Sequence, residues 1–369
     1  MSTSYSGPLP PGSVIGILGG GQLGRMTALA AAGFGYRCHV FTPEADAPAT
    51  QVCAQTTIAD WDDAEALAQF AAACDVVTYE FENIPAAAAA LVGRHAILRP
   101  DVRVLAICQD RITEKTFLGR IGVPTTRWRA AGDPDALARG VAETGLPAVL
   151  KSARLGYDGK GQVALVPGID LAAAWAETVA TGMASAGQPA IVEAWVEFAL
   201  EISVIVARSA GGDIAAYVPV ENQHENHVLR RTIAPAAITQ ALAAKAEWLA
   251  KAIAEALELV GVLAVEMFVG GDGALLVNEL APRPHNSGHW TIDGCAVSQF
   301  EQCVRAVAGL PLGPTRRHAD AVMENLLGDE IARWPELVAD PEVQLHLYGK
   351  NEARPGRKMG HFTRLRPCR

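Results

Sequence analysis

A glycine-rich turn between two apolar, strand-like runs restricts the fold of this chain more than any other feature. The turn is Gly270-Gly271-Asp272-Gly273, and the two runs are residues 264–269 and 274–278. This combination is typical of a β-hairpin. If the turn is a loop of even length, Val269 faces Ala274, and the pairing of the residues farther from the turn follows.

Two carboxylates lie in this hairpin. In the even register Glu266 faces Val277, and Glu279 is a diagonal neighbour of Glu266 on the same face, with Cβ atoms roughly 7–8 Å apart. Carboxylates so placed can hold magnesium, which prefers oxygen ligands and keeps several waters. Both lie among apolar residues, where an unpaired charge is costly. A bulge at the turn would change the register, and two exposed strand carboxylates are the alternative.

Composition excludes some classes of partner. The chain has 369 residues, half of them hydrophobic, and a formal net charge of −9. Its length suits two or three domains, and its composition suits a globular enzyme. Nucleic acids and anionic membrane surfaces bind proteins that have a basic face. Because this chain is acidic overall, we expect neither as a partner. The basic segment from His346 to Arg369 is either a solvated tail or an anion site.

The cysteines and the apolar segments bear on the cellular compartment in which we expect the protein. The seven cysteines are scattered and form no CxxC pair, so we expect reduced thiols in a cytoplasmic protein. Met1 to Ser13 does not resemble a signal peptide, and no segment is long and apolar enough to span a membrane.

The first hundred residues alternate strand and helix signals. Strands are expected at 13–18, 38–41 and 75–78 and around Ile97, and helices after Gly21 and over 62–74, which predicts parallel βαβ units. Strand signals dominate later, except for helices expected from Asp110 onward and over 172–180 and 238–259, and residues 221–231 are expected to form a polar loop. The predicted fold is α/β, with an N-terminal βαβ domain over 1–105, a central domain over 106–310 that includes a lid over about 125–195, and a small β-rich domain over 311–369.

Two glycine-rich segments suggest phosphate binding. Residues 19–24 contain GxGxxG between a strand and a helix, where backbone N–H groups can approach a phosphate. A dinucleotide site, another phosphate site and tight packing all stay open, and Glu44 lies where a ribose-binding acid could sit. Residues 154–162 have strands on both sides and lack the Lys-Ser/Thr of a P-loop, so a flap over nucleotide phosphates fits, with an ordinary hairpin turn as the alternative. Lys151 could place its ammonium on those phosphates.

Three further segments carry polar groups. Pro282 to His289 forms a proline-fixed loop dense in cations and donors, where an arginine could clamp a phosphate with two parallel bonds. Backbone groups of residues 193–196 could bind adenine, and Glu201 could bind ribose hydroxyls. An ordinary strand with one polar side is the favoured explanation of these residues. His224 and His227 have no metal-ligand spacing.

Four motifs together carry a family resemblance, and they lie at 19–26, 78–85, 156–162 and 278–289. They resemble the ATP-grasp superfamily and, more narrowly, the family of N5-carboxyaminoimidazole ribonucleotide synthetases. The resemblance implies an ATP-grasp fold with a pre-ATP-grasp domain, a homodimer, and a reaction in purine biosynthesis. In that reaction, ATP phosphorylates bicarbonate to carboxyphosphate, and the amine of 5-aminoimidazole ribonucleotide takes up the carboxyl group.

The resemblance also implies the site residues. Magnesium would be held by Glu266 and Glu279. Catalytic roles would fall to Lys151, Asp158, Arg283, His285 and Lys350, with Asp158 orienting or deprotonating the amine. ATP would be bound by Arg111, Lys151, Gly156, Tyr157, Asp158, Gly159, Lys160, Gly161, Gln162, Glu193, Ala194, Trp195, Val196, Glu201, His224, Asn278 and Glu279. The nucleotide substrate would be bound by Gln22, Leu23, Glu80, Tyr157, Asp158, Arg283, His285, Asn286, Lys350 and Arg357.

The sequence departs from the family pattern once and leaves two other functions to weigh. The family commonly has a glycine where His227 precedes Val228 and Leu229, which puts the local conformation and the role of His224 in question. The alternatives are another ATP-grasp ligase, such as the formate-using glycinamide ribonucleotide transformylase, and an NAD-dependent oxidoreductase. The oxidoreductase alternative leaves the flap and the carboxylate hairpin unexplained.

Overall fold

The computed structural model describes residues 7–154, 161–181 and 189–368. Its first domain is a parallel sheet in the order β3-β2-β1-β4, which confirms the predicted βαβ units. Its strands are β1 (Val14–Leu18), β2 (Arg37–Thr42), β3 (Gln55–Ile58) and β4 (Val76–Tyr79). Its helices are η1 (Pro48–Gln51), α1 (Gln22–Ala32), α2 (Ala64–Ala72), α3 (Ala86–His95) and α4 (Val102–Cys108).

Two details of this domain differ from expectation. Strand β3 was not expected, because its residues are mostly polar and largely exposed at the edge of the sheet. The strand expected around Ile97 is reduced to a single bridge between Val77 and Leu98.

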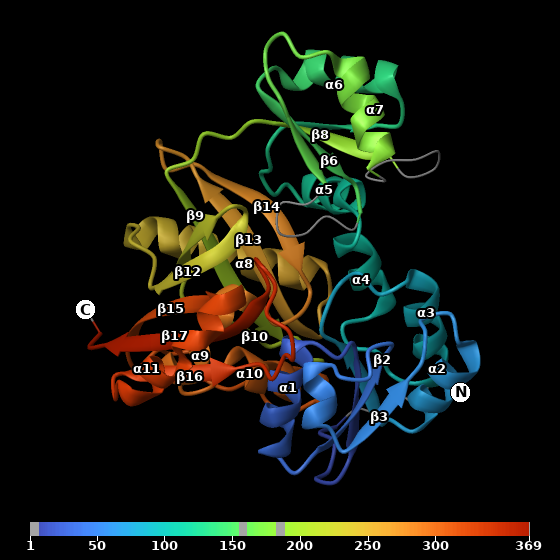
Figure 1. Cartoon of the computed structure of the whole chain (residues 1–369), viewed down its shortest axis with the longest axis vertical. Coiled ribbons are helices and arrows are strands. Elements are labelled where there is room, and N and C mark those ends of the chain that lie inside the picture. Colours follow the sequence, from blue (N-terminus) through green and yellow to red (C-terminus); the bar gives the residue numbers. More distant parts are fainter. Residues whose placement is uncertain (1–6, 155–160, 182–188, 369) are drawn as a thin grey trace.

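A small lid stands at the top of Figure 1, apart from the rest of the molecule. Its antiparallel sheet has the order β5-β8-β6-β7, and helix α5 (Arg111–Arg120) precedes it in the chain. The lid strands are β5 (Trp128–Ala131), β6 (Ala148–Ser152), β7 (Gln162–Leu165) and β8 (Ala190–Ala194), and its helices are α6 (Pro134–Thr144) and α7 (Leu171–Ala180). Leu137, Leu150 and Trp175 belong to a hydrophobic core of the lid's own.

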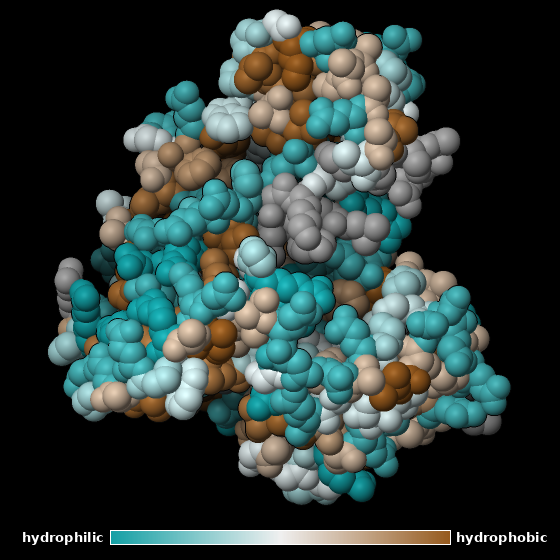
Figure 2. All heavy atoms as spheres, in the orientation of Figure 1, coloured by the Kyte–Doolittle hydropathy of each residue, from teal (hydrophilic) through white to brown (hydrophobic). Residues whose placement is uncertain are grey.

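A nine-stranded sheet forms the body of the molecule, in the order β14-β13-β9-β11-β12-β15-β17-β16 with β10 paired to β9. Its strands are β9 (Leu200–Arg208), β10 (Ile214–Ala216), β11 (Val220–Glu225), β12 (Val228–Ala234), β13 (Gly261–Val269), β14 (Leu275–Ala281), β15 (Asp320–Leu327), β16 (Val343–Leu347) and β17 (Lys358–Arg366). The elements packed around it are α8 (Gln240–Ala256), η2 (Asn286–Gly288), α9 (Thr291–Gly294), α10 (Gln299–Val307), η3 (Gly328–Arg333) and α11 (Trp334–Ala339). The strands after residue 311 therefore extend the central sheet. On the face shown in Figure 2, hydrophilic residues cover most of the region over β12, β15 and β17.

The predicted polar loop over residues 221–231 is wrong, because these residues form the hairpin β11–β12. Two of the buried positions of this hairpin, Asn222 and Thr232, are polar. Asn222 donates to Ser203 Oγ at 2.9 Å and accepts from Thr232 Oγ1 at 3.0 Å, so the buried groups satisfy one another. Hydropathy alone gives no strand signal in such a pair.

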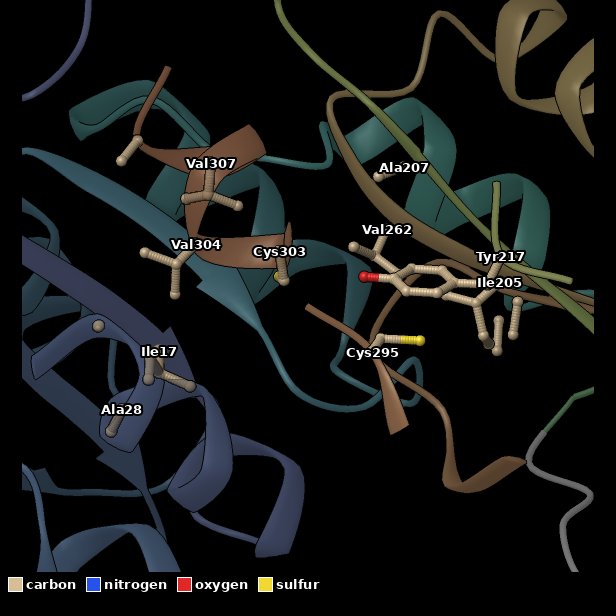
Figure 3. Packing of buried hydrophobic residues seen from close by; sticks show 14 of the residues in the cluster. Ile17, Ala28, Ile205, Ala207, Tyr217, Val262, Cys295, Cys303, Val304 and Val307 are labelled. Carbon is tan, nitrogen blue, oxygen red and sulfur yellow. The ribbon is translucent and has the colours of Figure 1, made fainter. Parts of the chain in front are cut away.

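Helix α10 joins the first domain to the body. In Figure 3, Val304 and Val307 of α10 lie toward Ile17 and Ala28 of the first domain. The same buried cluster continues to Val262 on β13. This apolar packing fixes the first domain against the central sheet. Among the described residues, no helix combines the length and the apolar character that a membrane span requires.

Candidate active site

A cavity of about 580 Å³ opens between the lid, the central sheet and the first domain. It gathers most of the predicted site residues, from three separate parts of the chain. Those that line it are Gln22, Leu23, Glu80, Arg111, Lys151, Gly161, Gln162, Glu193, Ala194, Trp195, Val196, Glu201, His224, Glu266, Asn278, Glu279, Arg283, His285 and Asn286. The predicted residues Gly156, Tyr157, Asp158, Gly159 and Lys160 lie outside the described part of the chain.

The hairpin β13–β14 carries the acidic pair, and its predicted register is wrong. Val269 pairs with Leu275 instead of Ala274, because the loop closes as a tight turn followed by Gly273 at φ +79°. The N–H of Gly273 donates to Gly270 O at 2.9 Å, and the N–H of Gly270 donates to Ala274 O at 2.9 Å. This is a turn with a glycine bulge, which makes the loop odd in length.

A second irregularity restores the acidic pair. The register shifts between Glu266 and Met267, so that Met267 pairs with Val277 and Glu266 pairs directly with Glu279. Asn278 is the extra residue on β14. The two carboxylates are therefore direct cross-strand neighbours, closer than the diagonal arrangement expected from the sequence.

Each carboxylate is contacted by a basic side chain. His285 Nε2 lies 2.9 Å from Glu266 Oε1, and Arg111 Nη1 lies 2.9 Å from Glu279 Oε2. Burial alone would raise the pKa of Glu266, but His285 holds it at about 2. Glu266 therefore stays charged at neutral pH.

The pair fits magnesium. The described residues contain no group of three or more His, Cys, Asp or Glu placed to hold a metal. Two carboxylates are nevertheless sufficient for magnesium, which keeps several waters and takes further oxygens from phosphates. The buried Oδ1 of Asn278, the residue before Glu279, has no hydrogen-bond partner among the described residues and could supply another oxygen.

A second cluster lies where the lid meets the central sheet. Lys151 on β6 donates to Glu193 Oε2 on β8 at 2.6 Å, and Lys115 on α5 lies 3.5 Å from Glu193 Oε1. Burial alone would raise the pKa of Glu193, but Lys151, Lys115 and Arg111 hold it at about 2. Lys115 was not expected at the site, because a lysine in a helix ordinarily lies in solvent.

Another part of the cavity lining offers stacked aromatic rings and a polar pair. Phe198 and Phe268 stack with ring centroids 4.8 Å apart, and both line the cavity, as does Trp195. His224 Nδ1 lies 2.5 Å from Glu201 Oε2. A planar base beside the rings and ribose hydroxyls at the polar pair would suit this part of the cavity.

The His224–Glu201 pair predicts a pH-dependent stability. Burial alone would lower the pKa of His224, but the hydrogen bond and charge of Glu201 raise it above the ordinary value. A raised pKa contributes stability that is complete below the unfolded-state pKa and is lost as pH rises through the folded-state pKa. His224→Gln should therefore lower the melting temperature more at pH 5.5 than at pH 9. In His318→Gln, a control at an exposed histidine, the two decreases should be equal. Equal decreases in His224→Gln would contradict the charged pair.

The departure at His227 has a structural counterpart. Asn226 and His227 form the two-residue turn of β11–β12 with φ values of 49° and 64°. Both central residues of such a turn need positive φ, which glycine adopts most easily. The hairpin thus forms without the glycine, the imidazole of His227 lines the cavity, and His224 keeps its place beside Glu201.

The glycine motif at the start of α1 holds an internal carboxylate. The N–H groups of Gly21 and Gly24 both donate to Glu80, at 2.8 Å for Gly24. A Cβ on Gly21 would lie 2.5 Å from Glu80 Oε1, so the glycine permits this close approach. The helix N-terminus is therefore already occupied by a negative group, which argues against a dinucleotide phosphate here.

The proline-fixed loop after β14 presents three polar side chains. Arg283 forms a two-pronged ion pair with Glu82 of the first domain, one contact being Nη2 to Oε1 at 2.9 Å. His285 Nδ1 accepts from the N–H of Ser287 at 3.3 Å, which leaves Nε2 to donate to Glu266. Both amide atoms of Asn286 are buried without a hydrogen-bond partner among the described residues. Asn286 is therefore available to a ligand.

The basic segment from His346 to Arg369 contributes a different residue to the cavity from those expected. Lys350 and Arg357 are not among the residues that line the cavity, whereas Lys358 lines it. Lys350 Nζ donates to Lys358 O at 2.7 Å, and burial lowers the pKa of Lys350 to about 8. Glu80, which lines the cavity, raises that pKa, so Lys350 lies close enough to influence the cavity by its charge.

Comparison with known proteins first defines a class. The family model of the ATP-grasp domain matches residues 116–300, and that of the ribonucleotide synthetase preATP-grasp domain matches residues 13–109. The phosphoribosylaminoimidazole carboxylase C-terminal domain matches residues 321–367. The chain is thus an α/β protein of the ATP-grasp fold, as predicted.

Individual relatives narrow the class. The N5-carboxyaminoimidazole ribonucleotide synthase of Brucella melitensis is 50% identical over 97% of this chain and 98% of its own length. An N5-carboxyaminoimidazole ribonucleotide synthetase crystallised with ADP is 43% identical, with a TM-score of 0.92 over 98% of this chain and 94% of its own. The Aspergillus clavatus enzyme, crystallised with ADP and 5-aminoimidazole ribonucleotide, is 30% identical, with a TM-score of 0.87 over 96% of this chain and 94% of its own.

The chain belongs to the family of N5-carboxyaminoimidazole ribonucleotide synthases. It is an ATP-dependent ligase, and the alternative of an NAD-dependent oxidoreductase is wrong.

Proposed function

We infer that this chain carboxylates 5-aminoimidazole ribonucleotide with bicarbonate, using ATP, and releases N5-carboxyaminoimidazole ribonucleotide, ADP and phosphate. One observation supports this most: the opposed Glu266–Glu279 pair, Lys151 and the loop 282–289 line a single cavity. The relatives' printed names and ligands support the same reaction.

ATP would lie across the cavity from the stacked aromatic rings to the acidic pair. The base would rest near Phe198 and Phe268, and the ribose hydroxyls would reach Glu201 and His224. Lys151 would reach the phosphates, since it faces the cavity while paired to Glu193. Glu266 and Glu279 would hold magnesium, which supplies positive charge to the phosphate oxygens when bound.

The reaction consists of a phosphoryl transfer followed by a carboxyl transfer. A bicarbonate oxygen forms a bond to the γ-phosphorus while the bond to ADP breaks, which gives carboxyphosphate. The amine nitrogen then bonds to the carboxyl carbon, phosphate leaves with the bicarbonate oxygen, and the amine loses a proton. Lys151 and Arg283 would spread the charge of the transferring phosphoryl group, because preformed cations act strongly in an enclosed site.

The substrate nucleotide would occupy the part of the cavity bordered by the first domain. Gln22 and Leu23 line this part with Glu80. Asn286 also lines the cavity, and its two buried amide atoms have no hydrogen-bond partner within the described part of the chain. Asp158 would orient the amine or take its proton, and Tyr157 would contact the same substrate. The phosphate group of the nucleotide suits Lys350, Arg357 and Lys358, which carry the positive charge of the basic segment. A cytoplasmic homodimer is part of the same proposal.

The test follows ADP release by purified protein. With magnesium and ATP, ADP should form only when both 5-aminoimidazole ribonucleotide and bicarbonate are added. Equal release with glycinamide ribonucleotide and formate would favour the formate-using alternative and overturn the proposal. Equal release without either substrate would also overturn it.

A further inference from the structure

Two charged residues of α5, Glu114 and Lys115, are buried beside the site without being among the predicted site residues. Their relative exposures are both 1%. A buried lysine is rare unless its ammonium is fully paired. Its surroundings therefore indicate what it holds in place.

Lys115 contacts both sides of a structural junction. Its Nζ donates to Asn278 O on β14 at 2.8 Å, lies 3.4 Å from Val277 O, and lies 3.5 Å from Glu193 Oε1 on β8. Strand β14 belongs to the central sheet, whereas β8 belongs to the lid sheet. The single ammonium thus links the acidic hairpin to the Glu193–Lys151 pair.

The contacts on β14 fall at its bulge. Asn278 is the extra residue that allows Glu266 to pair with Glu279. Lys115 binds the carbonyls of Val277 and Asn278, and the carboxylate of Glu114 accepts from the N–H of Leu280. Consecutive residues of one helix therefore hold β14 on both sides of Glu279. Without the bulge, Asn278 would face Glu266.

We propose that Lys115 is a positioning residue, which fixes the β14 bulge and the Glu193–Lys151 pair relative to each other so that the metal-binding carboxylates and the phosphate-binding lysine meet one nucleotide. This role rests on the proposed function for the identity of the nucleotide. It predicts that loss of Lys115 impairs metal binding in the nucleotide complex more than it impairs nucleotide binding itself.

The experiment measures binding, with Mn²⁺ and ADP as probes. Lys115→Met keeps the length of the side chain and removes its charge, and Lys245→Met is the control at an exposed lysine of α8. We expect Lys115→Met to weaken Mn²⁺ binding to the protein–ADP complex at least tenfold by electron paramagnetic resonance. The affinity for ADP without metal should change less than threefold by calorimetry. Lys245→Met should match the wild type in both measurements.

A second, conservative variant distinguishes the positioning effect from a loss caused by misfolding. Lys115→Arg keeps a cation beside Glu193 but cannot place one ammonium on two adjacent carbonyls, so Mn²⁺ affinity should fall at least threefold in a folded protein. Unchanged Mn²⁺ affinity in either folded variant, or parallel losses of Mn²⁺ and ADP affinity, would overturn the positioning role. Since the measurement uses neither bicarbonate nor the aminoimidazole nucleotide, it is independent of the carboxylation itself. Wild-type protein that binds no ADP would instead contradict the proposed nucleotide site.

Discussion

Glu279→Gln should lower kcat by about 1000-fold, because a carboxylate that holds magnesium contributes several kcal/mol to phosphoryl transfer. Glu279 pairs directly with Glu266 across the hairpin, and an amide in its place removes one negative charge from that pair. The fold should survive, since the Glu279 side chain is 38% exposed.

The measurement is steady-state ADP release at saturating substrates, with the melting temperature as a check on folding. Glu336→Gln is the matched control, because Glu336 is an exposed carboxylate of α11 outside the cavity. It should leave kcat unchanged. A folded Glu279→Gln protein with more than a tenth of wild-type kcat would remove the metal-binding role.

Arg283→Lys should lower kcat by about 100-fold, the usual loss when one preorganised donor of an enclosed site is removed. The Arg283 guanidinium binds both oxygens of Glu82, which joins the loop after β14 to the first domain. A lysine keeps the charge but cannot form two parallel bonds. Without the two-pronged ion pair, the loop after β14 would no longer be held in a fixed position against the first domain, beside the site where the substrates would react.

The control for this substitution is Arg129→Lys, which changes an exposed, ion-paired arginine of the lid. It should behave like the wild type in steady-state kinetics. If Arg283→Lys retained wild-type kcat and KM for both substrates, the two-pronged contact would have no part in catalysis.

Most of the site residues expected from the sequence line one cavity. The parallel first domain follows from its alternating strand and helix signals, whereas most of the expected site residues were implied by the family resemblance. The function of the GxGxxG motif at 19–24 could not be predicted from its residues. The group at the N-terminus of α1 is Glu80, which is distant in sequence.

What the sequence could not supply were long-range contacts and irregular strands. The hairpin register depended on two bulges, one at the turn and one at Asn278, and simple counting of alternate residues follows neither. Strands β11 and β12 bury Asn222 and Thr232 against each other, which removes the apolar signal. The sequence does not distinguish Lys115 from an exposed lysine, because its partners, Glu193 and two backbone carbonyls, are distant in the chain.

The most direct test of carboxyphosphate formation in this cavity uses bicarbonate labelled with ¹⁸O. If this cavity joins bicarbonate to the amine through carboxyphosphate, the oxygen that attacks the γ-phosphorus stays with phosphate. Mass spectrometry should then find one ¹⁸O in each phosphate released, with ADP and carboxylated nucleotide formed in equal amounts. Unlabelled phosphate, or ADP formed without carboxylated nucleotide, would contradict the account.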